Sequence, residues 1–305
     1  MQLLTSANGF IEELAFAPDG RALSAAVAYQ SPFLWDIPTT AAPKVLAEYA
    51  RGAHSLAFSA GSGIVSWITA QKRIEFERDT GDEREVQLLD NPQERLNSQA
   101  LTGPDSWLIV RTVETSLRFR IRCYIPDGSG AWEEKWIVGP AANLRGVVMA
   151  ATDSTRFFTW EESSAENNAE KPQLVTRSCR SGQLLEAVQL PVTNVFKLAA
   201  RRDGSEVVLP HNSFLHVWRP GEKPQKIKTG VRTHFRALAY HPSGHYLFAA
   251  NNDNTIRVIE TASWSVVKQF KWAIGRLSAV AVSPDGTLAA AGGEKGQVVV
   301  WDLDL

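Results

Sequence analysis

The side chains with the clearest potential for metal chemistry are five histidines between positions 211 and 245. A zinc site needs three or four ligands that converge on one ion. His234 and His241 lie on one predicted extended segment, about 23 Å apart at the rise of a β-strand, so they cannot share an ion. His241 and His245 flank a predicted hairpin turn, where no third ligand is apparent. We therefore expect no metal site and no cofactor.

The sequence also lacks the motifs of phosphate and acyl chemistry. It contains no G-x-x-x-x-G-K-[ST] and no G-x-S-x-G. The glycines of segment 292–296 lack the spacing of a dinucleotide site and are typical of a loop between strands. Cys123 and Cys179 fall on predicted strands, where we expect buried thiols of low reactivity. We expect no catalytic residue.

A funnel-type hydrolase site is one alternative that the residues leave open. Asn251, Asn252 and Asp253, together with Glu161 and Glu162, would supply its amides and carboxylates. The run from 251 to 254 also has the composition of a tight turn between two strands. The turn is the simpler interpretation.

Composition narrows the class of protein further. The chain has 305 residues, of which 44% are hydrophobic, and 32 basic residues balance 33 acidic ones. Two cysteines cannot form a disulfide framework, and no apolar run approaches the length of a membrane span. The N-terminus has neither the basic start nor the apolar stretch of a signal peptide. We expect a cytoplasmic globular protein with no membrane partner.

A repeated turn organises the whole chain. Leu-Ala-Phe-Ala-Pro-Asp-Gly at 14–20 returns as related segments at 238–244 and 280–286, and four weaker copies lie between the first two. Successive copies are 40 to 50 residues apart, which is the period of a propeller blade. Short apolar runs precede and follow each turn, and two further runs complete most periods. The pattern predicts four antiparallel strands per repeat.

These repeats resemble the WD40-repeat β-propeller family. The resemblance rests on the Pro-Asp-Gly turns and on two Trp-Asp pairs, and it covers essentially all of the chain. Family repeats usually carry a Gly-His pair before the first strand, which this chain lacks, so we expect packing between blades to provide most of its stability. The resemblance assigns structural roles in turns and blade cores to Asp19, Gly20, Trp35, Asp36, Trp218, Pro242, Gly244, Pro284, Asp285, Gly286, Trp301 and Asp302.

The turn count predicts an all-β fold, a single domain over 1–305 that forms a seven-bladed β-propeller of four-stranded antiparallel blades. Only three residues follow Asp302, too few for a last strand. Residues 2–6 are therefore expected to pair beside 297–303 and close the ring, which removes exposed sheet edges. The predicted blades span approximately 9–50, 51–91, 92–139, 140–191, 192–230, 231–272, and 273–305 plus 1–7. Six or eight blades remain alternatives.

Charge is distributed unevenly along the chain. Residues 197–276 contain 13 basic and 5 acidic residues, a net charge of +8, whereas 75–94 carries a net charge of −6. Arginines also recur six to nine residues before five of the seven turns, where blade entrances are expected to open onto one face. These arginines are Arg51, Arg95, Arg145, Arg236 and Arg276. A ring of guanidinium groups would favour an acidic or phosphorylated segment.

The favoured function is a non-catalytic scaffold that binds a protein or peptide through one propeller face and the channel mouth. Most WD-like propellers are interaction platforms, so this prediction follows largely from the resemblance. A lactonase-like hydrolase with a site at the channel is one alternative. The other is RNA binding by the basic blades five and six, with Phe235, Trp264 and Trp272 as stacking surfaces. Nucleic acid is not the partner that we favour.

Overall fold

The structure is a computed structural model in which strands are the only regular secondary structure of the described residues. No part of this described chain forms a helix with the length and apolar character of a membrane span. The described residues are 2–5, 9–28, 30, 32–37, 44–45, 54–58, 64–68, 74–78, 83–86, 94–102, 107–114, 118–127, 132–142, 149–150, 155–161, 172–192, 195, 197–230 and 232–304.

The strands of this described part form seven four-stranded antiparallel sheets, numbered here in chain order. The first sheet contains β2 (Ile11–Phe16), β3 (Ala22–Val27), β4 (Phe33–Asp36) and β5 (Lys44–Val45). The second contains β6 (His54–Phe58), β7 (Ile64–Ile68), β8 (Ile74–Arg78) and β9 (Glu83–Val86). The third contains β10 (Glu94–Thr102), β11 (Trp107–Glu114), β12 (Arg118–Pro126) and β13 (Trp132–Ala142). Its last strand extends past residue 139, where the sequence placed the boundary.

The remaining sheets follow the same order. The fourth contains β14 (Met149–Ala150), β15 (Arg156–Glu161), β16 (Gln173–Ser178) and β17 (Leu184–Gln189). The fifth contains β18 (Ala199–Ala200), β19 (Val207–His211), β20 (Phe214–Trp218) and β21 (Gln225–Lys228). The sixth contains β22 (Phe235–Tyr240), β23 (Tyr246–Asn251), β24 (Thr255–Glu260) and β25 (Ser265–Lys271). The seventh contains β26 (Leu277–Val282), β27 (Leu288–Gly293), β28 (Gln297–Asp302) and, at its outer edge, β1 (Gln2–Thr5).

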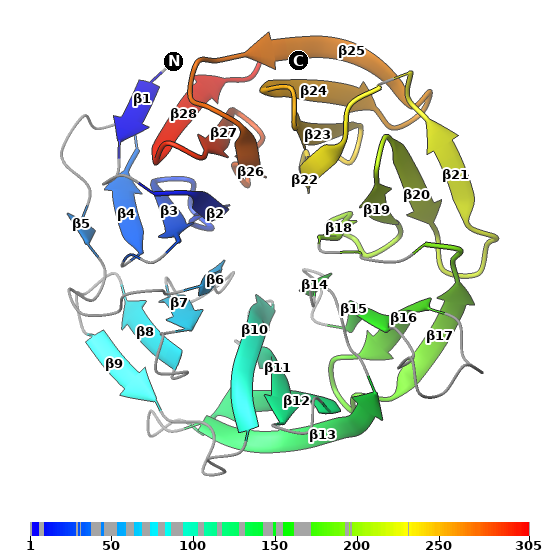
Figure 1. The fold of residues 1–305 in the computed structure, drawn as a ribbon. Coiled ribbons are helices and arrows are strands. Elements are labelled where there is room, and N and C mark those ends of the chain that lie inside the picture. Colours follow the sequence, from blue (N-terminus) through cyan, green and yellow to red (C-terminus); the bar gives the residue numbers. More distant parts are fainter. Residues whose placement is uncertain are drawn as a thin grey trace.

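The two ends of the chain meet in the seventh sheet. β1 pairs antiparallel with β28, with Gln2 opposite Val300 and Thr5 opposite Gln297. Figure 1 shows the seven sheets around a common centre. The innermost strand of each sheet, called its first strand here, is β2, β6, β10, β14, β18, β22 or β26. These first strands contact one another in the cyclic order β2, β6, β10, β14, β18, β22, β26 and again β2.

The hydrophobic cores lie between neighbouring sheets, because successive side chains of a strand point to opposite faces. Val298 and Val300 of β28 pack in a cluster with the first sheet, whereas Val299 and Trp301 pack in a cluster with the sixth. Trp35 is 2% exposed and lies in the first of these clusters, stacked on Phe33. Each sheet of this kind therefore contributes to two cores.

The tryptophans assigned to blade cores are buried as predicted. Trp218 is fully buried between the fourth and fifth sheets, and Trp301 is 4% exposed between the sixth and seventh. Asp36 and Asp302, which follow two of the tryptophans, end their strands as exposed side chains.

The repeated turns also have the predicted conformation. Asp285 accepts hydrogen bonds from the Ser283 hydroxyl (2.6 Å) and the Thr287 N–H (3.0 Å), and both lower its pKa. Gly286 then takes a φ of +77°, a region that strongly favours glycine. The Asp19 turn repeats this geometry, with the Arg21 N–H donating to the Asp19 carboxylate (2.8 Å) and a φ of +74° at Gly20.

A contact that the sequence did not suggest joins these turns across sheets. Arg201, at the start of the turn in the fifth sheet, donates from Nη2 to the carbonyl of Gly244 in the sixth (2.9 Å). His241, at the same position of the next turn, lies with Nε2 3.1 Å from the carbonyl of Gly286 in the seventh. Pro242 and Pro284 fix the backbone beside these residues. Gly244 and Gly286 are required for two reasons. Both have positive φ, and a Cβ would collide with the side chain of Arg201 or of His241, respectively.

A buried charge reinforces the junction between the fifth and sixth sheets. Glu206 is 1% exposed and forms an ion pair with Arg219 (2.5 Å). Its other oxygen accepts a hydrogen bond from the hydroxyl of Tyr240 on β22 (2.7 Å). Burial and the adjacent Glu206 carboxylate raise the pKa of Tyr240 well above its ordinary value. The tyrosine is therefore a donor at every pH where the protein is folded.

Gly244→Ala and Gly20→Ala separate the two demands on the turn glycine. Both residues have positive φ, but only Gly244 lies against a side chain, since Gly20 has open space within 4 Å. We expect G20A to lower the free energy of unfolding by about 1 kcal/mol through backbone strain. G244A should cost about 1 kcal/mol more, because Arg201 must leave the carbonyl that it binds. Urea denaturation of the purified variants measures both values.

Arg201→Ala provides the control. In the R201A background, G244A should lower the free energy of unfolding by no more than G20A does, because the guanidinium that a Cβ would displace is absent. An extra cost that persists in the double variant would show that the contact with Arg201 is not its cause.

Candidate interaction face

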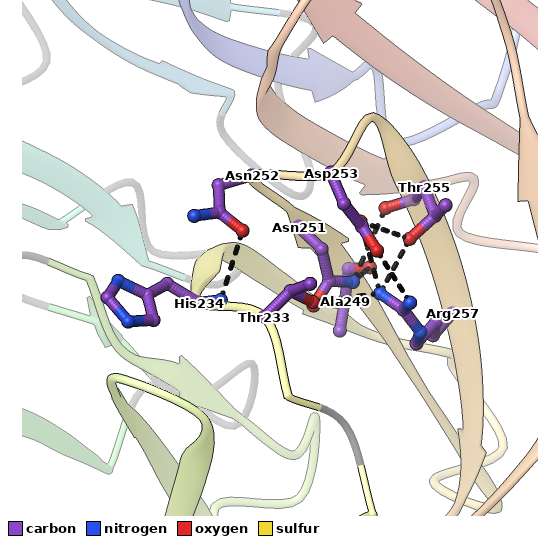
Figure 2. A network of polar contacts seen from close by, with 8 residues as sticks. All are labelled: Thr233, His234, Ala249, Asn251, Asn252, Asp253, Thr255 and Arg257. Atoms are coloured by element: carbon purple, nitrogen blue, oxygen red, sulfur yellow. Dashed lines mark hydrogen bonds and ion pairs between the residues drawn. The ribbon is translucent and has the colours of Figure 1, made fainter.

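Two segments of the sixth sheet meet at the face where its first strand begins. One leads into β22 and contains Thr233 and His234, and the other is the turn between β23 and β24. The Asn252 N–H donates to the carbonyl of His234 (3.0 Å), and the His234 N–H donates to the Asn252 side-chain oxygen (3.1 Å). Figure 2 shows the contact of the Asn252 side chain, with the His234 ring directed away from Asn252. The backbone of His234 is therefore fixed while its side chain is exposed.

The side chain of Arg257 on β24 connects the same two segments. Its guanidinium forms an ion pair with Asp253 (2.7 Å) and donates to the hydroxyls of Thr255 (2.6 Å) and Thr233 (3.1 Å). Burial acts to raise the pKa of Asp253, but the hydrogen bonds from Arg257 and Thr255 outweigh it and lower the pKa. We expected packing between blades to provide most of the stability in the absence of a Gly-His pair. In the sixth sheet Arg257 adds a polar network to that packing.

The backbone contact at His234 recurs in two other sheets and identifies equivalent positions. In the seventh sheet the Glu294 N–H donates to the carbonyl of Arg276 (3.0 Å), and in the first the Ala28 N–H donates to that of Phe10 (2.8 Å). Phe10, His234 and Arg276 therefore occupy the same place on three consecutive sheets. Phe10 is 43% exposed, and the Arg276 side chain is 65% exposed.

The charge around these three positions is mainly positive. Arg232 and Arg236 are exposed, and neither forms an ion pair within the described residues. Lys295 is exposed in the turn between β27 and β28. The only acid bound to one of the three equivalent residues in the described part is Glu294, whose carboxylate lies 2.8 Å from Arg276. We call Phe10, Arg232, His234, Arg236, Arg276 and Lys295 the entry face.

The arginines of the predicted ring that the structure describes do not occupy equivalent positions, and the ring itself stays a prediction. Arg236 lies on β22, two residues beyond His234, whereas Arg276 precedes β26, so the two are not at equivalent positions. Ser278 is the residue equivalent to Arg236, and it is buried. Arg95 lies on β10 opposite Val113. Arg51 and Arg145 lie outside the described residues. The sequence analysis placed Arg236 and Arg276 in one ring because it accepted any arginine six to nine residues before the turn, and Arg236 lies six residues and Arg276 eight residues before theirs.

Two of the three aromatic residues proposed for RNA stacking are buried. Phe235 is 7% exposed and Trp264 is 9% exposed, and both pack in the core between the fifth and sixth sheets. Trp272 lies against Phe270 and Trp301, with ring centroids 5.4 Å and 4.5 Å away. Phe235 is therefore a core residue and was wrongly assigned to partner binding, whereas Trp272 is half-buried beside the core between the sixth and seventh sheets.

The groups proposed for a hydrolase are engaged within the fold. Glu161 accepts hydrogen bonds from Arg177 (2.8 Å) and from the Thr159 hydroxyl (2.9 Å). Asn251 is fully buried, and its amide donates to the carbonyl of Ala249 (2.8 Å). Asp253 is held by Arg257, and Glu162 lies outside the described residues. These contacts orient loops and leave no pair of free carboxylates among the described candidates.

The cysteines and histidines likewise have structural surroundings. Cys123 and Cys179 are fully buried in one cluster between the third and fourth sheets, and burial raises the pKa of Cys123 far above its ordinary value. His211 and His216 lie with ring centroids 6.0 Å apart. No group of three His, Cys, Asp or Glu residues suited to a metal ion occurs in the part of the chain that the structure describes.

Phe10, Arg232, His234 and Lys295 are the residues of the entry face that sequence reasoning missed. Phe10 directly precedes the first strand, as His234 and Arg276 precede theirs, so alignment of strand starts would have identified all three. Counting back from the turn failed because the count accepted any arginine six to nine residues before it, whereas Phe10, His234 and Arg276 each lie eight residues before Pro18, Pro242 and Pro284. The first strands of these three sheets share one bulge, so their spacing to the turn is the same. Such register shifts occur at Ile11/Glu13, Phe235/Ala237 and Leu277/Ala279.

Comparison with protein families confirms the resemblance over the last part of the chain. Residues 224–260 and 265–302 each match the family described as WD domain, G-beta repeat. The first match contains β21 to β24 and the second contains β25 to β28, so each repeat joins the outer strand of one sheet to three strands of the next. The chain therefore carries WD40 repeats, which generally mediate protein–protein interactions. No curated protein matches the chain.

His216 should make the stability of the fold depend on pH. It is 4% exposed, its Nε2 has no hydrogen-bond partner, and burial, with His211 and Lys226 nearby, lowers its pKa to about 4. The unfolded chain binds the proton more tightly, at the ordinary histidine pKa of about 6.5. The free energy of unfolding should therefore fall by about 2 kcal/mol as the pH is lowered from 6.5 to 4.

The comparison of wild type with His216→Leu isolates this contribution. Urea denaturation between pH 7 and pH 4 should give a shallower pH dependence for H216L, whereas the exposed His245→Gln should retain the wild-type slope. Equal slopes for wild type and H216L would contradict the assignment.

Proposed function

We propose that this chain is a non-catalytic scaffold, a single-domain seven-bladed β-propeller that binds a partner protein through its entry face. The cyclic contacts of the seven first strands and the pairing of β1 with β28 support the closed propeller. The offset between repeats and sheets supports it too, because β1 supplies the strand that the last repeat leaves missing.

The observation that carries the proposed site is the equivalence of Phe10, His234 and Arg276. Three neighbouring sheets hold an exposed side chain at the same place, each anchored by the same backbone hydrogen bond. Side chains on a fixed backbone lose little conformational entropy on binding. Aromatic and arginine side chains are also the types most often found as interface anchors. This combination favours a protein partner over a small substrate.

The charge of the entry face favours an acidic or phosphorylated segment as the part of the partner that binds. Arg232, Arg236, Arg276 and Lys295 contribute four positive charges, against the carboxylates of Glu294 and of the exposed Glu12, which takes the place of Arg236 on the first sheet. The side chain of Arg276 is exposed enough to exchange Glu294 for a carboxylate or phosphate of the partner. The channel contributes less to binding in this proposal, since Lys197 extends from the fifth sheet to the carbonyl of Glu12 on the first (3.0 Å).

Phe10→Ala with Arg276→Ala tests the entry face. A partner captured from lysate by the wild-type chain and identified by mass spectrometry is purified and titrated against each variant by calorimetry. The double variant should bind at least tenfold more weakly, because loss of one anchor costs about 1 kcal/mol or more. Arg21→Ala, an exposed arginine at the opposite turns, is the matched control and should bind as wild type does.

Unchanged folding is checked by circular dichroism and the urea midpoint. A folded double variant that keeps wild-type affinity would exclude the entry face as the binding site. Enzymatic turnover by the wild-type protein on lactone substrates would overturn the scaffold assignment itself.

A further inference from the structure

The outer rim of the fifth sheet carries a second, separate concentration of positive charge. β21 is the last strand of that sheet, and Figure 1 shows it on the outside of the molecule. Lys226 and Lys228 lie on β21 and Lys223 just precedes it, and all three are exposed. None of them forms an ion pair within the described residues. We call Lys223, Lys226 and Lys228 the lysine edge.

The acidic residues of the fifth sheet do not neutralise this edge. Glu206 is buried against Arg219, and Glu222 lies 3.7 Å from the same arginine. Asp203 accepts hydrogen bonds from the N–H and hydroxyl of Ser205, which lower its pKa. The carboxylates of this sheet are therefore committed to internal contacts, and the lysine charge is open to an external anion.

The neighbouring rim extends the positive surface. β25, the outer strand of the sixth sheet, follows β21 along the rim in Figure 1 and carries Lys268 and the exposed Lys271. Lys268 lies over the Phe270 ring and donates to the carbonyl of Asp304 (2.9 Å). Glu260, at the end of β24, accepts a hydrogen bond from Ser263 (2.6 Å).

The side chains of this rim favour a polypeptide over a nucleic acid. Single-stranded nucleic acids bind basic grooves in which bases stack on exposed aromatic rings. Among the described residues of the fifth and sixth sheets, the only exposed large hydrophobic side chain is Val267. The Phe214 ring is covered by the Lys226 ammonium at 4.1 Å. No stacking surface accompanies the charge.

The backbone of β21 provides the second element of recognition. In the described part of the chain, β21 pairs with β20 on one side and with no strand on the other. Alternate residues of such an edge strand direct their N–H and C=O groups outward. Lysines on an edge prevent pairing with a second copy, because like charges would then face each other. The same lysines attract a strand that carries carboxylates at alternate positions.

From these observations we propose that the lysine edge binds an extended acidic segment of a partner protein, which adds to β21 as a further strand. Main-chain hydrogen bonds supply the register, and carboxylates on alternate residues pair with Lys226 and Lys228. This surface lies on the rim and does not depend on the proposed entry face.

The test uses a fluorescein-labelled ten-residue peptide of alternating glutamate and valine and the intact chain. Fluorescence anisotropy at 50 mM salt should show saturable binding that weakens at 300 mM salt. The triple variant K223E/K226E/K228E should bind at least tenfold more weakly. The matched variant R21E/K135E/R180E changes the same total charge on other sheets, away from the entry face, and should bind as wild type does. Hydrogen exchange should show that the peptide protects amides of β21.

Two N-methylated peptides distinguish strand addition from charge attraction alone. One carries N-methyl groups on the glutamates and the other on the valines, so each blocks one edge of the peptide backbone. Only one of them should lose binding, because only one edge pairs with β21. Equal binding of both N-methylated peptides, or equal binding by the two triple variants, would overturn the proposal.

Two further arms separate this surface from other binding modes. An oligouridylate that binds more tightly than the peptide and is lost in K223E/K226E/K228E would identify the rim as a nucleic-acid surface and overturn the proposal. F10A/R276A should bind the acidic peptide normally. Failure of the entry face and failure of the lysine edge are thereby distinguishable.

Discussion

The seventh sheet of this protein has two apolar faces and can bury them only against two neighbours. The alternation along β28 illustrates this constraint, since Val298 and Val300 face one core and Val299 and Trp301 face the other. A sheet at the end of a row would leave one such face in water, at a cost proportional to its apolar area. A cyclic arrangement leaves no end. The pairing of β1 with β28 ties the first and last parts of the chain into one sheet, where such an end would otherwise fall.

Polar side chains also connect neighbouring sheets. Among the described residues, several polar contacts between sheets lie at turns and strand ends, and others link a side chain in the middle of an outer strand to a neighbouring turn, as Glu186 does with the Gly221 N–H (2.9 Å). Arg201 with Gly244, and His241 with Gly286, bridge neighbouring turns on one side of the molecule. Arg257 and its partners fix the opposite loops of the sixth sheet. Both sets restrain loops that would otherwise be the most mobile parts of the fold.

The sequence predicted the strands and the turns but not the contacts between repeats. Period, turn chemistry and the positions of Trp35, Trp218 and Trp301 are local properties, and each followed from residues a few positions apart. The entry face depended on one exact position, and a count of six to nine residues before the turn was too wide to separate Arg236 from the equivalent residues Phe10, His234 and Arg276, which all lie eight residues before it. Phe235 was misplaced for a different reason. An aromatic residue in a basic segment looks available for stacking, but its face of the strand decides whether it is buried.

The division between core and surface also explains how one fold can present two chemically different binding surfaces. Substitution at Phe10, Arg276 or Lys226 changes no residue of the clusters between sheets, so these positions can vary without altering the packing that holds the molecule together. Glu206 shows the opposite case, because its charge is buried and depends on both Arg219 and Tyr240. Removal of one partner of such a group is strongly destabilising, since the remaining charge has no access to water. Recognition therefore belongs to strand ends and outer edges, where charge is exposed and the backbone is already fixed by its neighbours.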